Sequence, residues 1–184
     1  NPELKINVTG MMVVFRDLVT LIIKSSIFSI TFSLFVIGVI ASIFFKRILW
    51  GFLAVIPLSS AVIINFGFMG YFGIELSHIT ALLSSIIIGV GVDFSIHYIA
   101  QFRRLSRTVS ADKLSREVVD DVGYPIILDA ASNMGFGALL FSAFLPIQYI
   151  GGLMVFAMMS TSLGTLTVLA ALAELLKKKL IGRS

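Results

Sequence analysis

The sequence contains several uncharged apolar runs that are each long enough to cross a lipid bilayer. A helix needs about 20 apolar residues to span roughly 30 Å of hydrocarbon. Runs of this kind cover residues 25–45, 48–74 and 130–173, and a fourth, 76–102, carries one carboxylate. Pro146 divides the longest run, because a proline in a helix interior removes a hydrogen bond and clashes with the preceding turn. The pattern therefore predicts five membrane-spanning helices.

The composition agrees with a membrane protein. Of the 184 residues, 58% are hydrophobic and only 13% are charged, whereas a soluble domain needs about a quarter charged residues. This excludes a soluble enzyme, a nucleic-acid-binding module and a disordered tail. The absence of cysteine excludes a disulfide scaffold, a thiolate metal site and a cysteine nucleophile. We expect an all-α membrane bundle with no nucleic-acid partner.

Proline and charge set the expected boundaries of the spans. Pro57 lies inside the second span and predicts a kink. Pro125 and Pro146 lie where a helix would begin, a position that tolerates proline. The predicted spans are about 25–45, 48–72, 77–102, 124–144 and 147–174.

Four smaller segments flank these spans. Alternating apolar and polar residues in 4–8 predict a short strand, and residues 1–10 are interpreted as the end of an extracytoplasmic domain of a longer protein. Residues 11–24 mix charged and apolar side chains and predict an interfacial helix. Residues 110–122 predict an amphipathic cytoplasmic helix with Ser110 as its N-cap. Residues 177–184 form a basic tail.

Basic residues are divided unequally between the two sets of loops. Three precede the first span, and the remaining 11 of the 14 lysines and arginines lie on the opposite set of loops. The positive-inside rule then places the N-terminus outside and the C-terminus in the cytoplasm, as in a multi-pass protein of the cell (inner) membrane. The net charge of +4 is explained by this topology and by attraction to anionic lipid.

Asp93 lies inside the third predicted span. A carboxylate there costs about 2.5–3.5 kcal/mol or more, and usually marks an ion path or a proton relay. Burial favours the neutral acid, so Asp93 could take up and release a proton. His97 lies one turn away on the same face and is a second relay candidate. The alternative is a permanently protonated Asp93 that hydrogen-bonds a neighbouring helix.

Depth along the spans suggests partners for these two residues. Asp93 lies roughly 13 Å from the cytoplasmic end of its span at 1.5 Å per residue, and Asn133 and Thr165 fall at a similar depth. Ordinary hydrogen bonding between helices is the alternative for both. Asp129 can share a layer with His97, as an ion pair, a proton entry path or a carboxylate hydrated near the headgroups.

The glycines near Asp93 favour helix packing over phosphate binding or proteolysis. Gly89, Gly91 and Gly137 are small residues of the kind that let membrane helices approach closely. The Gly-x-Gly-x-Asp sequence is one residue longer than the motif of intramembrane aspartyl proteases. Two histidines make a poor zinc site without carboxylate help. We therefore expect no enzyme activity, no metal and no cofactor.

The sequence Gly-Val-Gly-Val-Asp-Phe-Ser-Ile-His at 89–97, followed by Arg103 and Arg104, resembles a known family. It is similar to the fourth or tenth transmembrane helix of resistance–nodulation–division (RND) transporters, above all the mycobacterial-membrane-protein-large and hopanoid-exporter branch. Residues 133–142 resemble the fifth helix of that family. The same five-span unit occurs as the sterol-sensing domain. Phe94 stands where the family often has tyrosine, so a relay would use water, His97 or the other half.

The resemblance implies a function and a set of partners. The chain would be the last five spans of one half of a proton-driven exporter of lipids or other hydrophobic compounds, with Asp93 as relay. Its partners would be the other transmembrane half, the porter domains, membrane lipids, protons, a hydrophobic substrate and further copies in an oligomer. One alternative is a non-transporting lipid- or sterol-sensing or scaffold module. Another is a Sec-type accessory subunit for protein translocation.

Overall fold

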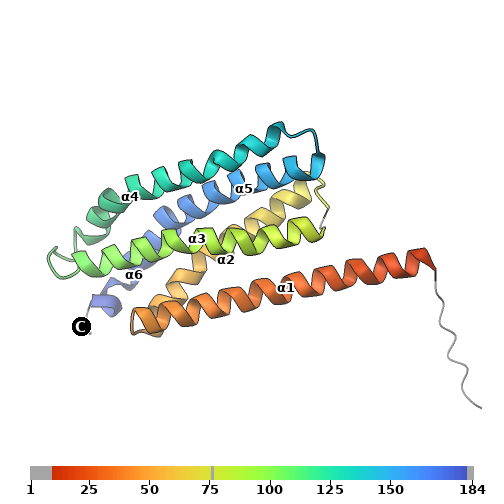
Figure 1. Cartoon of the computed structure of the whole chain (residues 1–184). Helices are drawn as coiled ribbons and strands as arrows, with labels where there is room; N and C mark the ends of the chain where they lie inside the picture. The colour runs from red at the N-terminus through yellow and green to blue at the C-terminus, as the bar shows by residue number, and fades with distance from the viewer. Residues whose placement is uncertain (1–9, 76, 182–184) are drawn as a thin grey trace, which may run out of the picture.

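A computed structural model describes residues 10–75 and 77–181, and within these ranges all regular secondary structure is helical. The elements are α1 (Met11–Phe44), α2 (Ile48–Tyr71), α3 (His78–Leu105), α4 (Leu114–Asn133), the 3₁₀ helix η1 (Met134–Phe141), α5 (Leu145–Gly164), the π-helix η2 (Thr165–Leu169) and α6 (Ala170–Ile181). In these described ranges, five helical segments are long and apolar enough to cross a membrane. The predicted all-α five-span fold is confirmed (Figure 1). The strand predicted at residues 4–8 lies outside the described residues.

The first span differs from the prediction at its N-terminal end. No break separates residues 11–24 from residues 25–45, because α1 is one helix of 34 residues; the interfacial position of residues 11–24 stays a prediction. Residues 11–37 contain neither glycine nor proline, and Ser26 Oγ donates to the Ile22 carbonyl without interrupting the helix. At about 51 Å, α1 exceeds the hydrocarbon thickness, and its first turns extend past the rest of the bundle (Figure 1).

The fourth span also begins earlier than predicted. A cytoplasmic helix at 110–122 followed by a separate span from 124 is wrong, because α4 runs from Leu114 through Pro125 without interruption. Its N-cap is Lys113, so Ser110 does not cap it. One buried stripe with a spacing of four extends along both parts and holds the helix together across the proline: Leu114, Val118, Val122, Ile126 and Ala130. Pro125 itself is exposed, where its missing N–H is tolerated.

The remaining prolines agree with the predicted pattern. Pro146 lies in the first turn of α5. Pro57 lies inside α2, which changes direction along its length (Figure 1). The fifth span continues through η2 into α6, so the segment expected as a basic tail is helical as far as Ile181.

The bundle core lies between α2, α3, α4 and α5. Trp50 and Phe102 meet edge to face with ring centroids 5.7 Å apart, and Tyr98 packs 6.4 Å from Phe102. α1 buries only three residues, at positions 26, 30 and 41, and so lies at the edge of the bundle. The largest fully buried side chains are Leu53, Leu58, Ile87, Ile88, Phe94, Tyr98, Ile99, Phe102, Leu114, Ile126, Leu153 and Met154.

Polar contacts between distant segments bring the basic loops to one end of the bundle. Arg47 Nη1 donates to the Leu180 carbonyl at 2.8 Å. The Arg103 guanidinium lies 5.4 Å from the centroid of the Phe45 ring. Ser115 hydrogen-bonds Glu174, which ties the start of α4 to α6. The turn after α1, the end of α3, the start of α4 and α6 therefore form one basic end.

Candidate functional site

Asp93 and His97 lie on the outward-facing side of α3. Both side chains are exposed, whereas Phe94, Ser95 and Tyr98 between and beside them are buried. Gly89 is on the same outward side, and a Cβ built on it meets no atom of the described residues within 4 Å. α3 therefore turns its aromatic side into the bundle and Gly89 and Asp93 away from it, while His97 lies at the border next to α4. No other described helix of this chain covers that side at Gly89.

Gly91 lies on the inward side of α3 and is tightly packed. A Cβ built on it would be 2.7 Å from Thr161 Cγ2 on α5 and 2.9 Å from Leu58 Cδ2 on α2. Three helices meet at this residue because it has no side chain. Gly137 on η1 is a looser contact, where a Cβ would lie 3.2 Å from Val155 Cγ2 of α5.

A groove of about 320 Å³ separates α3 from α4. Its lining includes both His97 and Asp129, the pair that depth arithmetic placed in one layer. Among the described residues no hydrogen bond or ion pair joins these two side chains. The full lining is Phe94, His97, Ala100, Gln101, Asp121, Val122, Pro125, Ile126 and Asp129.

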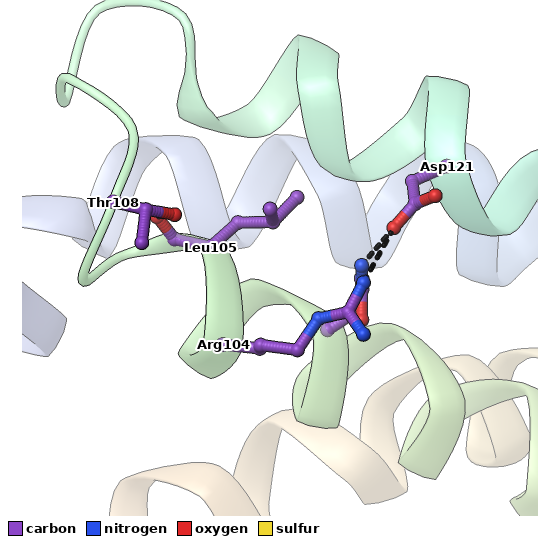
Figure 2. A network of polar contacts seen from close by, with 5 residues as sticks. Arg104, Leu105, Thr108 and Asp121 are labelled. Carbon is purple, nitrogen blue, oxygen red and sulfur yellow. Dashed lines mark hydrogen bonds and ion pairs between the residues drawn. The ribbon is translucent and has the colours of Figure 1, made fainter.

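A polar network joins the two walls of this groove near the basic end. Arg104 Nη2 on α3 lies 3.2 Å from Asp121 Oδ2 on α4, and Gln101 Nε2 donates to the same carboxylate oxygen. Figure 2 shows Arg104 and Asp121 reaching toward each other between the two helices. Both are at least half exposed, so the ion pair contributes less than about 1 kcal/mol. We did not predict this network, although Arg104 and the acidic start of the fourth span are visible in the sequence.

The predicted partners of Asp93 are engaged elsewhere or buried. Asn133 Nδ2 donates to Asp129 Oδ1 at 3.1 Å and to the Asp129 carbonyl at 3.0 Å, both within the fourth span. Thr165 is fully buried, and its hydroxyl has no hydrogen-bond partner among the described residues. No hydrogen bond in the described ranges links Asp93 with Asn133 or Thr165. The first predicted layer is thus not assembled by direct contacts within this chain.

Two irregular helical segments begin next to these partners. η1 starts directly after Asn133, and η2 starts at Thr165. Stretches of 3₁₀ and π-helix inside longer helices frequently mark hinges or functional sites. Gly135 and Gly137 are a signal for the first of these in the sequence, whereas no sequence feature predicts the second.

Three further buried polar side chains were not predicted as site residues. Asn65 Oδ1 on α2, Ser95 Oγ and Tyr98 Oη on α3 are enclosed without a hydrogen-bond partner in the part of the chain that the structure describes. An unpaired buried polar group costs about 1–3 kcal/mol. Polar groups retained in a membrane interior at this cost are candidates for a role in function.

The geometry defines a multi-pass membrane domain of five spans with an acidic residue on an exposed helix side. Residues 43–176, well over half of the chain, match the family described as the sterol-sensing domain of SREBP cleavage-activation. The chain belongs to the sterol-sensing domain family. Membership indicates a membrane role connected with lipids or sterols.

The chain is also similar to an archaeal protein. It is 28% identical over 151 residues to MJ1562 of Methanocaldococcus jannaschii, which is named as a membrane protein. The similarity covers 81% of this chain and 39% of MJ1562, so the chain spans about two-fifths of that relative's length. No solved structure matches the chain.

Proposed function

We propose that the chain is one transmembrane half of an exporter of lipids or other hydrophobic compounds, driven by the proton-motive force. In this proposal it belongs to the mycobacterial-membrane-protein-large and hopanoid-exporter branch of the RND superfamily, and Asp93 is its proton relay. The observation that carries the proposal is the exposed Asp93–His97 side of α3 next to the α3–α4 groove.

The exposure of Asp93 supports a partner outside this chain. A charged carboxylate facing hydrocarbon costs at least about 2.5–3.5 kcal/mol, and no described residue of the chain hydrogen-bonds Asp93. That cost is removed if the side faces water or a second transmembrane half in the complete protein. Gly89, which leaves open space one turn away, would admit a helix of that half.

Polar side chains on α3 form a ladder from the basic end to Asp93. Arg104, Gln101, His97 and Asp93 follow one another at spacings of three to four residues and cover roughly 16 Å at 1.5 Å per residue. The α3–α4 groove is lined by the two middle residues of this ladder, His97 and Gln101, and Asp129 lies on its other wall. With the basic end in the cytoplasm, water in the groove together with His97 would carry protons between the cytoplasm and Asp93, and Arg104 and Gln101 would only line the route.

The irregular helices offer a way to couple protonation to movement. Neutralising Asp93 would change how the α3 side packs against its partner. The adjacent fourth and fifth spans contain η1 and η2, and such irregular segments inside helices often mark functional hinges. We propose that these segments absorb the shift and pass it to porter domains outside the membrane.

A lipid- or sterol-sensing module is the second candidate, and membership of the sterol-sensing domain family supports it equally. In that case Asp93 would remain protonated and act as a hydrogen-bonding residue. Sensing requires no net movement of protons, so proton flux distinguishes the two candidates.

Proton uptake by proteoliposomes tests the proposal. The full-length protein is reconstituted with a pH-sensitive dye inside, and a pH step is applied. We expect Asp93→Asn to reduce uptake to the level of protein-free liposomes, and Asp93→Glu to retain part of it. Ile86→Val, on the exposed side of α3 and outside the α3–α4 groove, is the matched control and should leave uptake unchanged. Equal uptake by the wild type and Asp93→Asn would favour the sensing module.

A further inference from the structure

A second groove, separate from the α3–α4 groove, lies between the end of α1 and the start of α2. Its volume is about 560 Å³, and its lining is almost entirely apolar. From Leu34 to Ile43 it extends roughly 14 Å along α1, close to half the thickness of the hydrocarbon layer. The lining residues are Leu34, Phe35, Gly38, Val39, Ser42, Ile43, Ile48, Gly51, Phe52 and Val55.

Two glycines form the floor of this groove. A Cβ built on Gly51 would lie 2.2 Å from the Gly38 carbonyl oxygen and 1.9 Å from Ser42 Oγ, so the two helices touch through their backbones. Ser42 Oγ already donates to the Gly38 carbonyl at 2.6 Å. The floor therefore offers no free polar group. Phe35 and Phe52, both exposed, stand on the two sides of this narrow trough.

The groove ends at the turn between α1 and α2, where cations gather. Lys46 is exposed at this turn, and within the described residues it forms no ion pair. Arg47 is bonded to the Leu180 carbonyl, and Arg103 covers the Phe45 ring next to the turn. An apolar trough about one leaflet deep thus ends next to the turn that carries the exposed Lys46, while the two arginines are held against α6 and the Phe45 ring.

We propose that this groove binds an anionic phospholipid, with one acyl chain in the trough and the phosphate at Lys46. Basic pockets between membrane helices bind anionic headgroups in this way. The apolar floor and the depth of about one leaflet suit a flexible acyl chain, and Lys46 supplies the charge complement of the phosphate. The proposal is independent of the proton relay, because the two grooves share no lining residue.

Photo-crosslinking in nanodiscs tests this site. The full-length protein is placed in phosphatidylcholine nanodiscs that contain a trace of phosphatidylglycerol or phosphatidylcholine with a diazirine on one acyl chain. Labelled positions are mapped by mass spectrometry. We expect the phosphatidylglycerol probe to label the groove preferentially. Lys46→Gln should reduce this labelling roughly fivefold, the ratio corresponding to about 1 kcal/mol per lysine near anionic lipid, and Lys46→Arg should retain it.

A second, independent test of the lipid site fills the groove with a larger side chain. Val39→Trp should remove groove labelling, whereas Ile40→Trp, on the neighbouring position outside the groove, should not. Three results would overturn the proposal. Equal labelling by both probes that ignores Lys46→Gln would show ordinary surrounding lipid. Displacement of the probe by cholesterol but not by unlabelled phosphatidylglycerol would show a sterol site. No labelling of groove residues would show that another segment covers them.

Discussion

At the scale of single residues, the two sides of α3 have different roles. The inward side packs against other helices, and the outward side carries the proposed proton relay. Gly91 on the inward side is enclosed by Thr161 and Leu58, whereas Gly89 on the outward side meets nothing within 4 Å among the described residues. The two glycines are equivalent in the sequence motif and different in the structure. Packing and relay functions can therefore be tested separately by substitution.

The same substitution should lower the stability of the protein at Gly91 and leave it unchanged at Gly89. Gly91→Leu would force a large side chain against α2 and α5, and overpacking of this kind costs about 1–3 kcal/mol. Gly89→Leu, facing outward, should leave the stability of this five-span unit unchanged. Thermal unfolding in detergent measures both. A loss of stability confined to Gly89→Leu would contradict the packing described for α3.

Asp93 was identifiable from the sequence because it is the one charged residue in its span. Its exposure was not predictable, because the sequence does not show which side of α3 the other helices cover. The same limit applies to Asn133. Depth arithmetic placed it near Asp93, but its amide hydrogen-bonds Asp129 four residues earlier in the fourth span. The spacing of residues along one helix predicted contacts better than a comparison of membrane depth between residues on different helices.

At the scale of elements, the five spans follow from the length of the apolar runs. Pro146 was correctly placed in the first turn of α5. Lys24 and Pro125 were wrongly taken as boundaries. A single charge does not end a helix that extends beyond the bilayer, and the buried stripe on α4 outweighs the hydrogen bond lost at Pro125. Tertiary packing of this kind cannot be recognised from local signals.

The buried stripe on α4 can be tested by two neighbouring isoleucines. Ile126 is 2% exposed and Ile127 is 58% exposed. Ile126→Ala should destabilise the protein by about 2 kcal/mol. This is the lower end of the free-energy range measured for such cavities in soluble proteins, because lipid already solvates apolar groups in the unfolded reference state. Ile127→Ala should have almost no effect. Denaturation in mixed micelles gives both values, and equal effects would mean that α4 packs differently.

At the scale of the whole molecule, the basic residues gather at one end of the bundle. Contacts from Arg47 to α6 and from Arg104 to α4 draw these loops together. Such an end favours the cytoplasmic side of the membrane, where anionic lipids and the positive-inside rule both act.

Cysteine labelling tests the orientation, because the chain has no cysteine of its own. Glu75→Cys lies between α2 and α3, and Ser110→Cys lies between α3 and α4 at the basic end. In intact cells a membrane-impermeant maleimide should label position 75 and not position 110. The opposite pattern would reverse the topology and place the basic end outside.

The central claim is that Asp93 exchanges protons from within the membrane. Carbodiimides react with protonated carboxyls in apolar surroundings, so labelling of Asp93 in the full-length protein, across roughly pH 5 to 9 with Asp93→Asn as the blank, measures this directly. The proton-relay account predicts strong labelling at low pH that falls reversibly within this range. Full labelling at every pH would show a permanently neutral aspartic acid and would contradict the account.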